Sequence, residues 1–254
     1  MPGRSRFDAV LFDLWGTLVA PGVIERDVVG AEMAHDLGVD PVAFVRRVVD
    51  SHAARFLGLT GDLRETVAGL ATACGGRPTT AQIDRAAERR LAMTRRLLVP
   101  SAATLRVLDR LRATDLRLAL VTDSSIETPT VWPESALADR FDATVFSCLV
   151  GVRKPAPWMY LSAARAVGAV PGRCLFVGDG DSHELSGAVA AGMRAVRLHD
   201  VAQTAATQHV GDVEFTGPAI DSLDGLLRPP WSLAASTGSP LTSRRPPAAA
   251  EKRS

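Results

Sequence analysis

Three side chains of this 254-residue chain have types and positions that suit the transfer of a chemical group: Asp13, Thr122 and Asp179. Each directly follows, or stands within two residues of, a short apolar run of the kind that forms a buried strand. An aspartate carboxylate can attack an electrophilic centre and form a covalent intermediate. A threonine hydroxyl can donate to an oxygen of the transferred group, and a further carboxylate can help to hold a hard cation such as Mg²⁺. We therefore expect a nucleophile, an oxygen-binding group and a metal ligand.

Two further residues bear on this chemistry, Lys154 and Trp15. Only two of the 29 basic residues are lysines, Lys154 and Lys252, so a lysine well inside the chain is unusual here. Its ammonium could offset the repulsion between neighbouring carboxylates and an anionic substrate. Trp15 stands two residues after Asp13, where an acid could protonate a leaving group, but an indole N–H only donates and does not titrate. We therefore expect a charge-balanced site that lacks an acid at that position.

The elements that must position these residues alternate between strand and helix. Apolar runs predict buried strands, and helical spacing between the later runs predicts the helices that connect them. This alternation is typical of an α/β fold, a Rossmann-like parallel sheet with helices on both faces. Ligands of such sheets bind beyond the carboxyl ends of the strands, so we expect Asp13, Thr122 and Asp179 to meet at one edge. The expected strands are Asp8–Phe12, Leu116–Val121, Ala143–Phe146, Cys174–Val177 and Ala195–Leu198, and the expected connecting helices are Ser101–Arg112, Pro155–Val167 and Ser182–Ala191.

One stretch, residues 21–98, interrupts the alternation with helices alone. Helical patterns separated by glycines replace any strand there, which predicts a helical cap domain inserted after the first strand. We therefore expect an α/β core made of residues 1–20 and 99–228 and a cap made of residues 21–98. The last segment, residues 229–254, is rich in Pro, Ser, Ala and Arg and is expected to be disordered. The helical patterns of the cap are Ile24–Leu37, Pro41–Leu57, Asp62–Ala73 and Thr80–Leu98.

The composition excludes several classes of partner. The net charge is +1, which gives no electrostatic reason to expect nucleic acid or a membrane surface as a partner. No apolar run reaches the roughly 18 residues that span a bilayer, and the first run ends in Asp13 without resembling a signal peptide. Three widely spaced cysteines, Cys74, Cys148 and Cys174, suit free thiols in the cytoplasm. We expect a cytoplasmic monomer or homodimer with a small, anionic substrate. The arginines of the cap are expected on a solvated helix face, and Arg55 is the first candidate to contact that substrate.

Four segments occur in the order found in one enzyme superfamily. They are Phe12–Leu18, Leu120–Asp123, Gly151–Pro157 and Val177–Leu185. Together they resemble the motifs of the haloacid dehalogenase-like hydrolases, and the predicted cap is similar to the cap of the first type in that superfamily. The resemblance implies that Asp13 is the nucleophile, Thr122 the donor to a phosphate oxygen and Lys154 the group that balances charge.

The resemblance also implies a metal site. Mg²⁺ would be held by Asp13, Asp179 and the backbone carbonyl of Trp15. Glu184 would be the second acid of the fourth motif and would act on the metal directly or through water, with Asp181 as the other candidate for that contact.

Three functions stay open within this resemblance. Phosphatases of the superfamily carry an acid at the position of Trp15, whereas its dehalogenases carry an aromatic residue there. Asp179 and Glu184 favour a phosphatase, because a metal-free dehalogenase does not need paired metal-binding acids. We therefore expect a Mg²⁺-dependent phosphatase that acts on a small phosphorylated metabolite through an aspartyl-phosphate at Asp13. The first alternative is a haloacid dehalogenase-type or other hydrolase whose leaving group needs no proton, and the second is a weakly active phosphate-binding or regulatory protein.

Overall fold

The structure, a computed structural model, describes residues 6–199, 211–233 and 248–249 of the chain. Most of the segment predicted to be disordered, residues 229–254, therefore lies outside the described residues. None of the described helices combines the length and the apolar character that crossing a membrane would require. The three cysteines are free, and Cys148 and Cys174 are buried.

Seven strands form one sheet, in which every pair of neighbours is parallel. The strands are β1 (Ala9–Phe12), β2 (Arg117–Thr122), β3 (Ala143–Phe146), β4 (Cys174–Gly178), β5 (Arg194–Leu198), β6 (Ala219–Ile220) and β7 (Ala248–Ala249). Their order across the sheet is β6-β5-β4-β1-β2-β3-β7, so β1 is central and lies between β2 and β4. This arrangement confirms the predicted α/β, Rossmann-like fold class.

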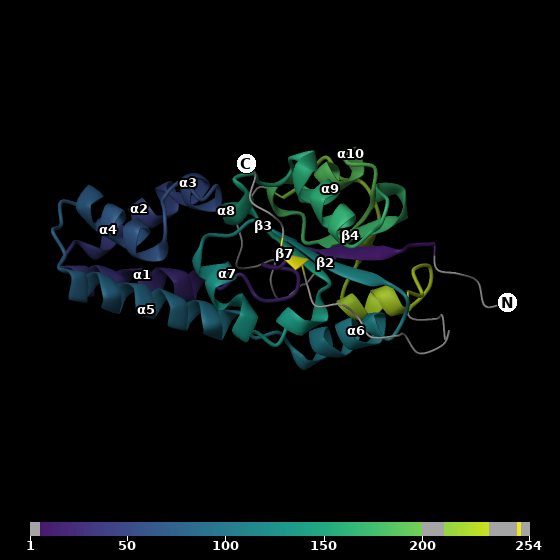
Figure 1. Ribbon diagram of the computed structural model, residues 1–254, viewed down its shortest axis with the longest axis horizontal. Coiled ribbons are helices and arrows are strands. Elements are labelled where there is room, and N and C mark those ends of the chain that lie inside the picture. The colour runs from purple at the N-terminus through teal and green to yellow at the C-terminus, as the bar shows by residue number, and fades with distance from the viewer. Residues whose placement is uncertain (1–5, 200–210, 234–247, 250–254) are drawn as a thin grey trace.

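Helices cover both faces of the sheet (Figure 1). On one face lie α6 (Ala102–Arg112) and a short helical turn at Leu223–Leu227. On the other face lie α9 (Pro157–Ala166) and α10 (Glu184–Ala190). The chain thus has the three layers that a parallel sheet needs in order to bury both of its faces.

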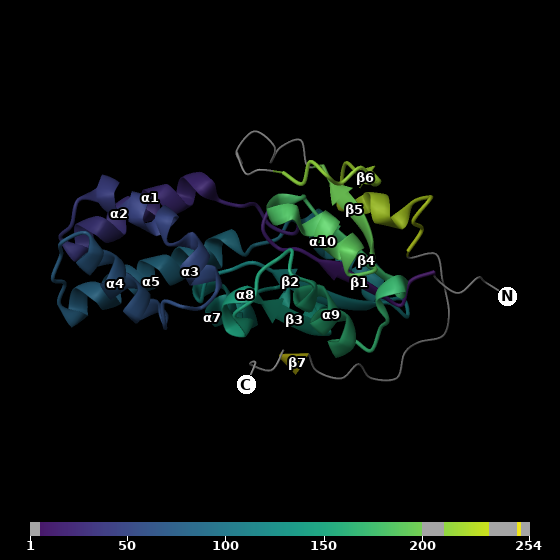
Figure 2. The same cartoon turned by 90° about the horizontal axis from the view of Figure 1, so that it is seen from above.

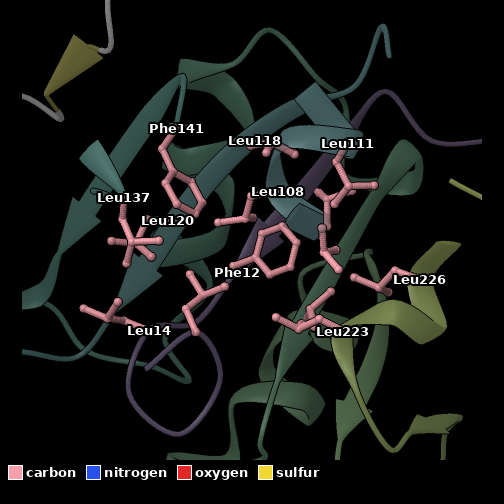
Figure 3. Close-up of a cluster of buried hydrophobic side chains, with 14 of the residues drawn as sticks. Phe12, Leu14, Leu108, Leu111, Leu118, Leu120, Leu137, Phe141, Leu223 and Leu226 are labelled. Carbon is pink, nitrogen blue, oxygen red and sulfur yellow. The ribbon is translucent and has the colours of Figure 1, made fainter. Parts of the chain in front are cut away.

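Neighbouring residues of β1 pack into different layers of the core. Phe12 lies in a cluster with Leu108 of α6 and Leu223, which Figure 3 shows around the central strands. The preceding residue, Leu11, lies in a second cluster with Tyr160 of α9. This alternation is what an extended strand imposes, because successive side chains point to opposite faces. All four residues of β1 are fully buried, which holds the position of Asp13 at the end of the strand.

Six helices lie between β1 and β2, and the first five form a separate layer beside the sheet, as both views show (Figures 1 and 2). They enclose a hydrophobic cluster of their own that includes Met33, Phe44 and Met93. The helices are α1 (Val23–Leu37), α2 (Pro41–Asp50), α3 (His52–Phe56), α4 (Leu63–Ala73) and α5 (Thr80–Leu97). We call this layer the cap; the residue boundaries predicted for the cap and the core stay predictions.

The cap contacts the core through two short helices. α7 (Glu127–Val131) follows β2 and contacts α5, and α8 (Ser147–Val150) follows β3 and contacts α3. Both short helices begin beyond the carboxyl ends of their strands. The cap therefore stands over the edge of the sheet at which ligands bind in folds of this class.

Two expected helices differ from those observed. The helix expected at Pro41–Leu57 is divided at Ser51, whose hydroxyl donates to the backbone carbonyl of Val48 at 2.9 Å. Such a bond competes with the regular pattern of the helix and favours its end. The helix expected from Ser182 begins at Glu184 instead, because Ser182 and His183 have φ angles of 56° and 54°, which are left-handed.

Leu108→Ala tests the packing of α6 against the sheet. Leu108 is fully buried in the cluster of Figure 3, so the substitution leaves a cavity. We expect the free energy of unfolding to fall by about 2–5 kcal/mol. The matched control is Leu59→Ala, at a residue that is 73% exposed, which should change that free energy by less than about 0.5 kcal/mol. Urea unfolding followed by circular dichroism measures both, and equal losses would contradict the packing described.

Candidate active site

Three predicted site residues lie at adjacent ends of the central strands. Asp13 directly follows β1, Thr122 is the last residue of β2, and Asp179 directly follows β4. The last residue of β1 pairs with Leu120 on one side and with Val177 on the other, so the three strands end within two residues of one another. Asp13, Thr122 and Asp179 therefore gather at the carboxyl edge of the sheet, over which the cap stands.

Lys154 joins two of the acids at this edge. Its Nζ donates to Oδ1 of Asp13 and to Oε2 of Glu184, both at 2.5 Å. Asp13 and Lys154 are almost completely buried and Glu184 is completely buried. Oδ1 of Asp123 accepts the backbone N–H of Lys154 at 3.0 Å, and the Tyr160 hydroxyl donates to the carbonyl of Glu184 at 2.9 Å. The predicted charge-balancing lysine thus contacts the predicted nucleophile and is fixed by its surroundings.

Three carboxylates form a group that could hold a metal ion. One oxygen from each of Asp13, Asp179 and Glu184 lies within 4.8 Å of the other two. Among the described residues, Lys154 is the cation that pairs with this group, so three acids share one positive side chain. Carboxylate oxygens are hard ligands that suit Mg²⁺, Mn²⁺ or Ca²⁺. The donor set and its excess of negative charge therefore fit a divalent cation.

The loop after β4 orients these acids through its backbone. The N–H of Gly180 donates to Oε1 of Glu184 at 3.0 Å, and the N–H of Asp181 donates to Oδ1 of Asp179 at 2.9 Å. The carboxylate of Asp181 accepts the N–H of Ser182 at 2.6 Å. Of the two acids that sequence analysis left open, Glu184 lies in the carboxylate group, whereas Asp181 bonds within its own loop.

Burial dominates the electrostatics of the site. It raises the pKa of Asp13 to about 6, although Lys154 opposes the rise, and Asp179 adds to it. Burial and the nearby charge of Asp13 raise the pKa of Glu184 well above its ordinary value. Burial alone would lower the pKa of Lys154, but Asp13 and Glu184 raise it well above its ordinary value, so the ammonium stays charged. The site therefore stabilises the charged form of Lys154, whereas its carboxylates repel one another.

The loop after β1 passes close to Asp179 and requires glycine at one position. Gly16 has a φ of 84°, and a Cβ there would overlap Oδ2 of Asp179. The next residue, Thr17, has a buried hydroxyl without a hydrogen-bond partner in the part of the chain that the structure describes. We did not predict this free donor, which lies four residues after Asp13; its one signal in the sequence is the pair Gly16-Thr17. The hydroxyl of Thr122, also buried, makes a long bond of 3.4 Å to the carbonyl of the next residue.

Cap arginines approach the site from above Trp15. The guanidinium carbon of Arg26 lies 4.4 Å from the centre of the Trp15 ring, a cation–π contact. Arg55 and Arg90 are buried, so the predicted solvated helix face is wrong for both. The reason is Glu127 of the core, whose carboxylate lies 2.6 Å from Arg90 and 4.0 Å from Arg55. A contact between Arg55 and a substrate stays a prediction.

One protein family matches most of the chain. A family model described as haloacid dehalogenase-like hydrolase matches residues 7–192. The matched range includes the four segments on which the resemblance rests and all the residues of the carboxylate group. No curated protein matches the chain.

Solved structures that share the fold include two dehalogenases and a phosphatase. The 2-haloacid dehalogenase from Pseudomonas syringae is 25% identical, with a TM-score of 0.64 over 87% of this chain and 96% of that chain. The L-2-haloacid dehalogenase from Xanthobacter autotrophicus, with chloropropionic acid covalently bound, is 20% identical, with a TM-score of 0.60 over 88% and 99% of the two chains. A phosphatase of the same superfamily from Thermococcus onnurineus is 21% identical, with a TM-score of 0.60 over 87% and 96%. These likenesses establish the fold and do not choose between the two reactions.

The raised pKa of Asp13 predicts a loss of stability in the metal-free protein. The pKa is about 6 in the folded state against 3.8 for a free aspartate, so the folded state binds the proton more tightly. The contribution of this group to folding is then present at low pH and is lost as the pH rises through 6. Asp13→Asn removes that titration and should raise the free energy of unfolding by about 2–3 kcal/mol at pH 7, but by less than about 1 kcal/mol at pH 4.

Urea unfolding in the presence of a chelator, at both pH values, measures this difference. The control is Asp139→Asn at an exposed aspartate, which should change stability little at either pH. A gain from Asp13→Asn that is equal at pH 4 and pH 7 would contradict the described burial of the carboxylate.

Proposed function

The chain belongs to the haloacid dehalogenase-like hydrolases, and within this family we propose that it is a Mg²⁺-dependent phosphatase of a small phosphorylated metabolite. The observation that carries this proposal is the carboxylate group of Asp13, Asp179 and Glu184, whose oxygens lie within 4.8 Å of one another. A metal-free reaction does not need this excess of negative charge, whereas binding a phosphate through a divalent cation does. The three free cysteines support a cytoplasmic location.

In the proposed reaction the carboxylate of Asp13 attacks phosphorus. A bond forms between a carboxylate oxygen and phosphorus while the bond from phosphorus to the leaving oxygen breaks. Lys154, which bonds to Oδ1 of Asp13 at 2.5 Å, holds the carboxylate in place and opposes the rise of its pKa. Thr122 would donate its hydroxyl to a non-bridging oxygen of the phosphoryl group. Water then attacks the phosphorus of the aspartyl-phosphate and loses a proton to solvent, while the bond from phosphorus to the Asp13 oxygen breaks. This step releases inorganic phosphate and restores the carboxylate of Asp13.

The residues that would hold Mg²⁺ are Asp13, Asp179 and the backbone carbonyl of Trp15, with Glu184 directly or through water. When bound there, the ion would offset the negative charge of the phosphoryl oxygens beside these carboxylates. The fully buried Glu184 already accepts hydrogen bonds from Lys154 and from the N–H of Gly180. These bonds favour a contact between Glu184 and the ion through a water molecule.

Trp15 limits which leaving groups this site can release. An indole does not titrate, so the leaving oxygen must take its proton from solvent. Arg26, which covers the ring, cannot replace the acid, because burial lowers the pKa of its guanidinium only to about 10. Loss of general acid–base help typically costs about 10²–10⁴-fold in rate, and less for a good leaving group. We therefore propose that the preferred substrates are phosphate esters whose leaving group is stable as an anion.

The same residue favours one alternative, a dehalogenase-type hydrolase. A departing halide needs no proton, so Trp15 would not impair that reaction. Two structures that share the fold are named as 2-haloacid dehalogenases, which is consistent with this alternative. The carboxylate group argues against it, since the displacement of a halide does not require a divalent cation.

A panel of phosphate esters and 2-haloacids, each assayed with and without Mg²⁺, tests the proposed function. We expect Mg²⁺-dependent release of inorganic phosphate and no release of halide. Turnover of haloacids that a chelator leaves unchanged would contradict the phosphatase and establish the alternative. Binding of Mg²⁺ and phosphate without turnover of any ester would instead identify a weakly active phosphate-binding protein.

Trp15→Asp tests the role of position 15. A carboxyl group there can donate a proton to the leaving oxygen, so we expect hydrolysis of an alkyl phosphate to rise by about 10-fold or more. Hydrolysis of an aryl phosphate, whose leaving group needs little protonation, should rise less. Trp15→Asn is the matched control, because it has the same shape as the aspartate without a proton to donate. Equal changes for both esters, or equal changes in both variants, would show that position 15 has no acid–base function to restore.

A further inference from the structure

A cluster of arginines from the cap meets the core beside the candidate active site. Arg26 comes from α1, Arg55 from α3 and Arg90 from α5. Glu127 of α7 forms ion pairs with Arg55 and Arg90, and its charge also acts on Arg26. Arg90 pairs closely with Glu127, with Nη2 at 2.6 Å and Nε at 2.8 Å from Oε1. Arg55 is more distant, with its Nη1 at 4.0 Å from Oε1 of Glu127 and at 3.0 Å from the Ser125 hydroxyl.

This arginine cluster carries more positive charge than its partner can neutralise. Three guanidinium groups share one buried carboxylate, that of Glu127, and the other acid that influences Arg26 is Glu25, which is exposed. Burial lowers the pKa of Arg26 and of Arg55 to about 10, which still leaves both protonated at neutral pH. An unpaired charge that is withdrawn from water is unfavourable. A contact whose only function was to hold the cap against the core would therefore not need this excess of positive charge.

Arg26 has donors that no described residue uses. Its Nε–H donates to the carbonyl of Pro21 at 2.8 Å, and its guanidinium carbon lies over the ring of Trp15. A guanidinium carries five N–H donors, and no other described residue accepts from this one. The two terminal nitrogens of Arg26 are therefore available to a ligand, in the fork geometry that matches a carboxylate or a phosphate.

The arginine cluster also lies next to the reacting groups. Trp15, beneath Arg26, is two residues from the nucleophile Asp13. Ser125, which accepts from Arg55, is three residues from Thr122 and belongs to the same loop after β2. A substrate whose phosphoryl group lies at Asp13 would therefore have the cluster beside its other end.

We propose that Arg26, Arg55 and Arg90 form a second anion-binding site that receives a carboxylate or a second phosphate of the substrate. The substrate class is then that of phosphate monoesters with a further acidic group. This proposal rests on the proposed phosphatase function, because it takes the phosphoryl group to lie at Asp13. Recognition of the second acid falls to Arg26 above all, since Glu127 already occupies Arg90.

Binding of two phosphonates in the presence of Mg²⁺ tests the proposal without any need for turnover. The probes are 3-phosphonopropionate, which has a carboxylate, and propylphosphonate, which has a methyl group in its place. Calorimetric titration of the full chain should show at least about 10-fold tighter binding of 3-phosphonopropionate, the size expected for one good charge-assisted pair. Arg26→Gln should reduce this advantage to less than about 3-fold and leave the affinity for propylphosphonate unchanged.

Two further variants make the test specific. Arg47→Gln removes an exposed arginine of the cap and should keep the full advantage. Arg26→Lys keeps the charge without the fork and should keep part of it. Thermal melting of all four proteins checks that the variants are folded.

The outcomes separate the two proposals. Equal affinity of the wild type for both phosphonates, or an advantage that survives in folded Arg26→Gln, would overturn the arginine site while the phosphatase stands. Failure of both phosphonates to bind the wild type with Mg²⁺ would overturn the phosphatase function, and the second anion-binding site with it.

Discussion

The ammonium of Lys154 is the interaction on which the site depends. It lies between two buried acids, Asp13 and Glu184, that are far apart in the sequence. The sheet brings the acids together, because β1 and β4 are neighbours that end at the same level. The loop that supplies the lysine is held in turn by Asp123. Without this cation the acids would repel one another in a region that excludes water, and their pKa values would rise further.

Opposite charges collect on the two sides of the junction between core and cap. The core edge has three carboxylates and one lysine, and the arginine cluster has three guanidinium groups, two of which pair with Glu127. Trp15 links the two sides. It is two residues from Asp13 in the sequence, and its ring lies under the guanidinium group of Arg26. A divalent cation on the core side and a second acidic group on the cap side would neutralise both excesses. The replacement of a titrating acid by Trp15 then fits a residue that supports Arg26 instead of moving a proton.

Much of the core could be predicted from the sequence, because it depends on short-range signals. All five expected strands occur, since each is a short apolar run whose burial on both faces leaves few alternatives. The gathering of Asp13, Thr122 and Asp179 followed from the parallel sheet alone. The short helices α7 and α8 and the division at Ser51 were missed, because they depend on contacts between segments distant in sequence or on one side-chain bond. The expectation of a solvated face for Arg55 and Arg90 is wrong for the same reason, since their partner Glu127 lies on another element.

The central claim is that Asp13 acts as a nucleophile and becomes phosphorylated. Intact-protein mass spectrometry after acid quench, during turnover of an aryl phosphate with Mg²⁺, tests it most directly. The account predicts an adduct with the mass of one phosphoryl group, located on the peptide that contains Asp13, which decays when substrate is exhausted. The absence of such an adduct during measurable turnover, or its presence on a different residue, would contradict the account.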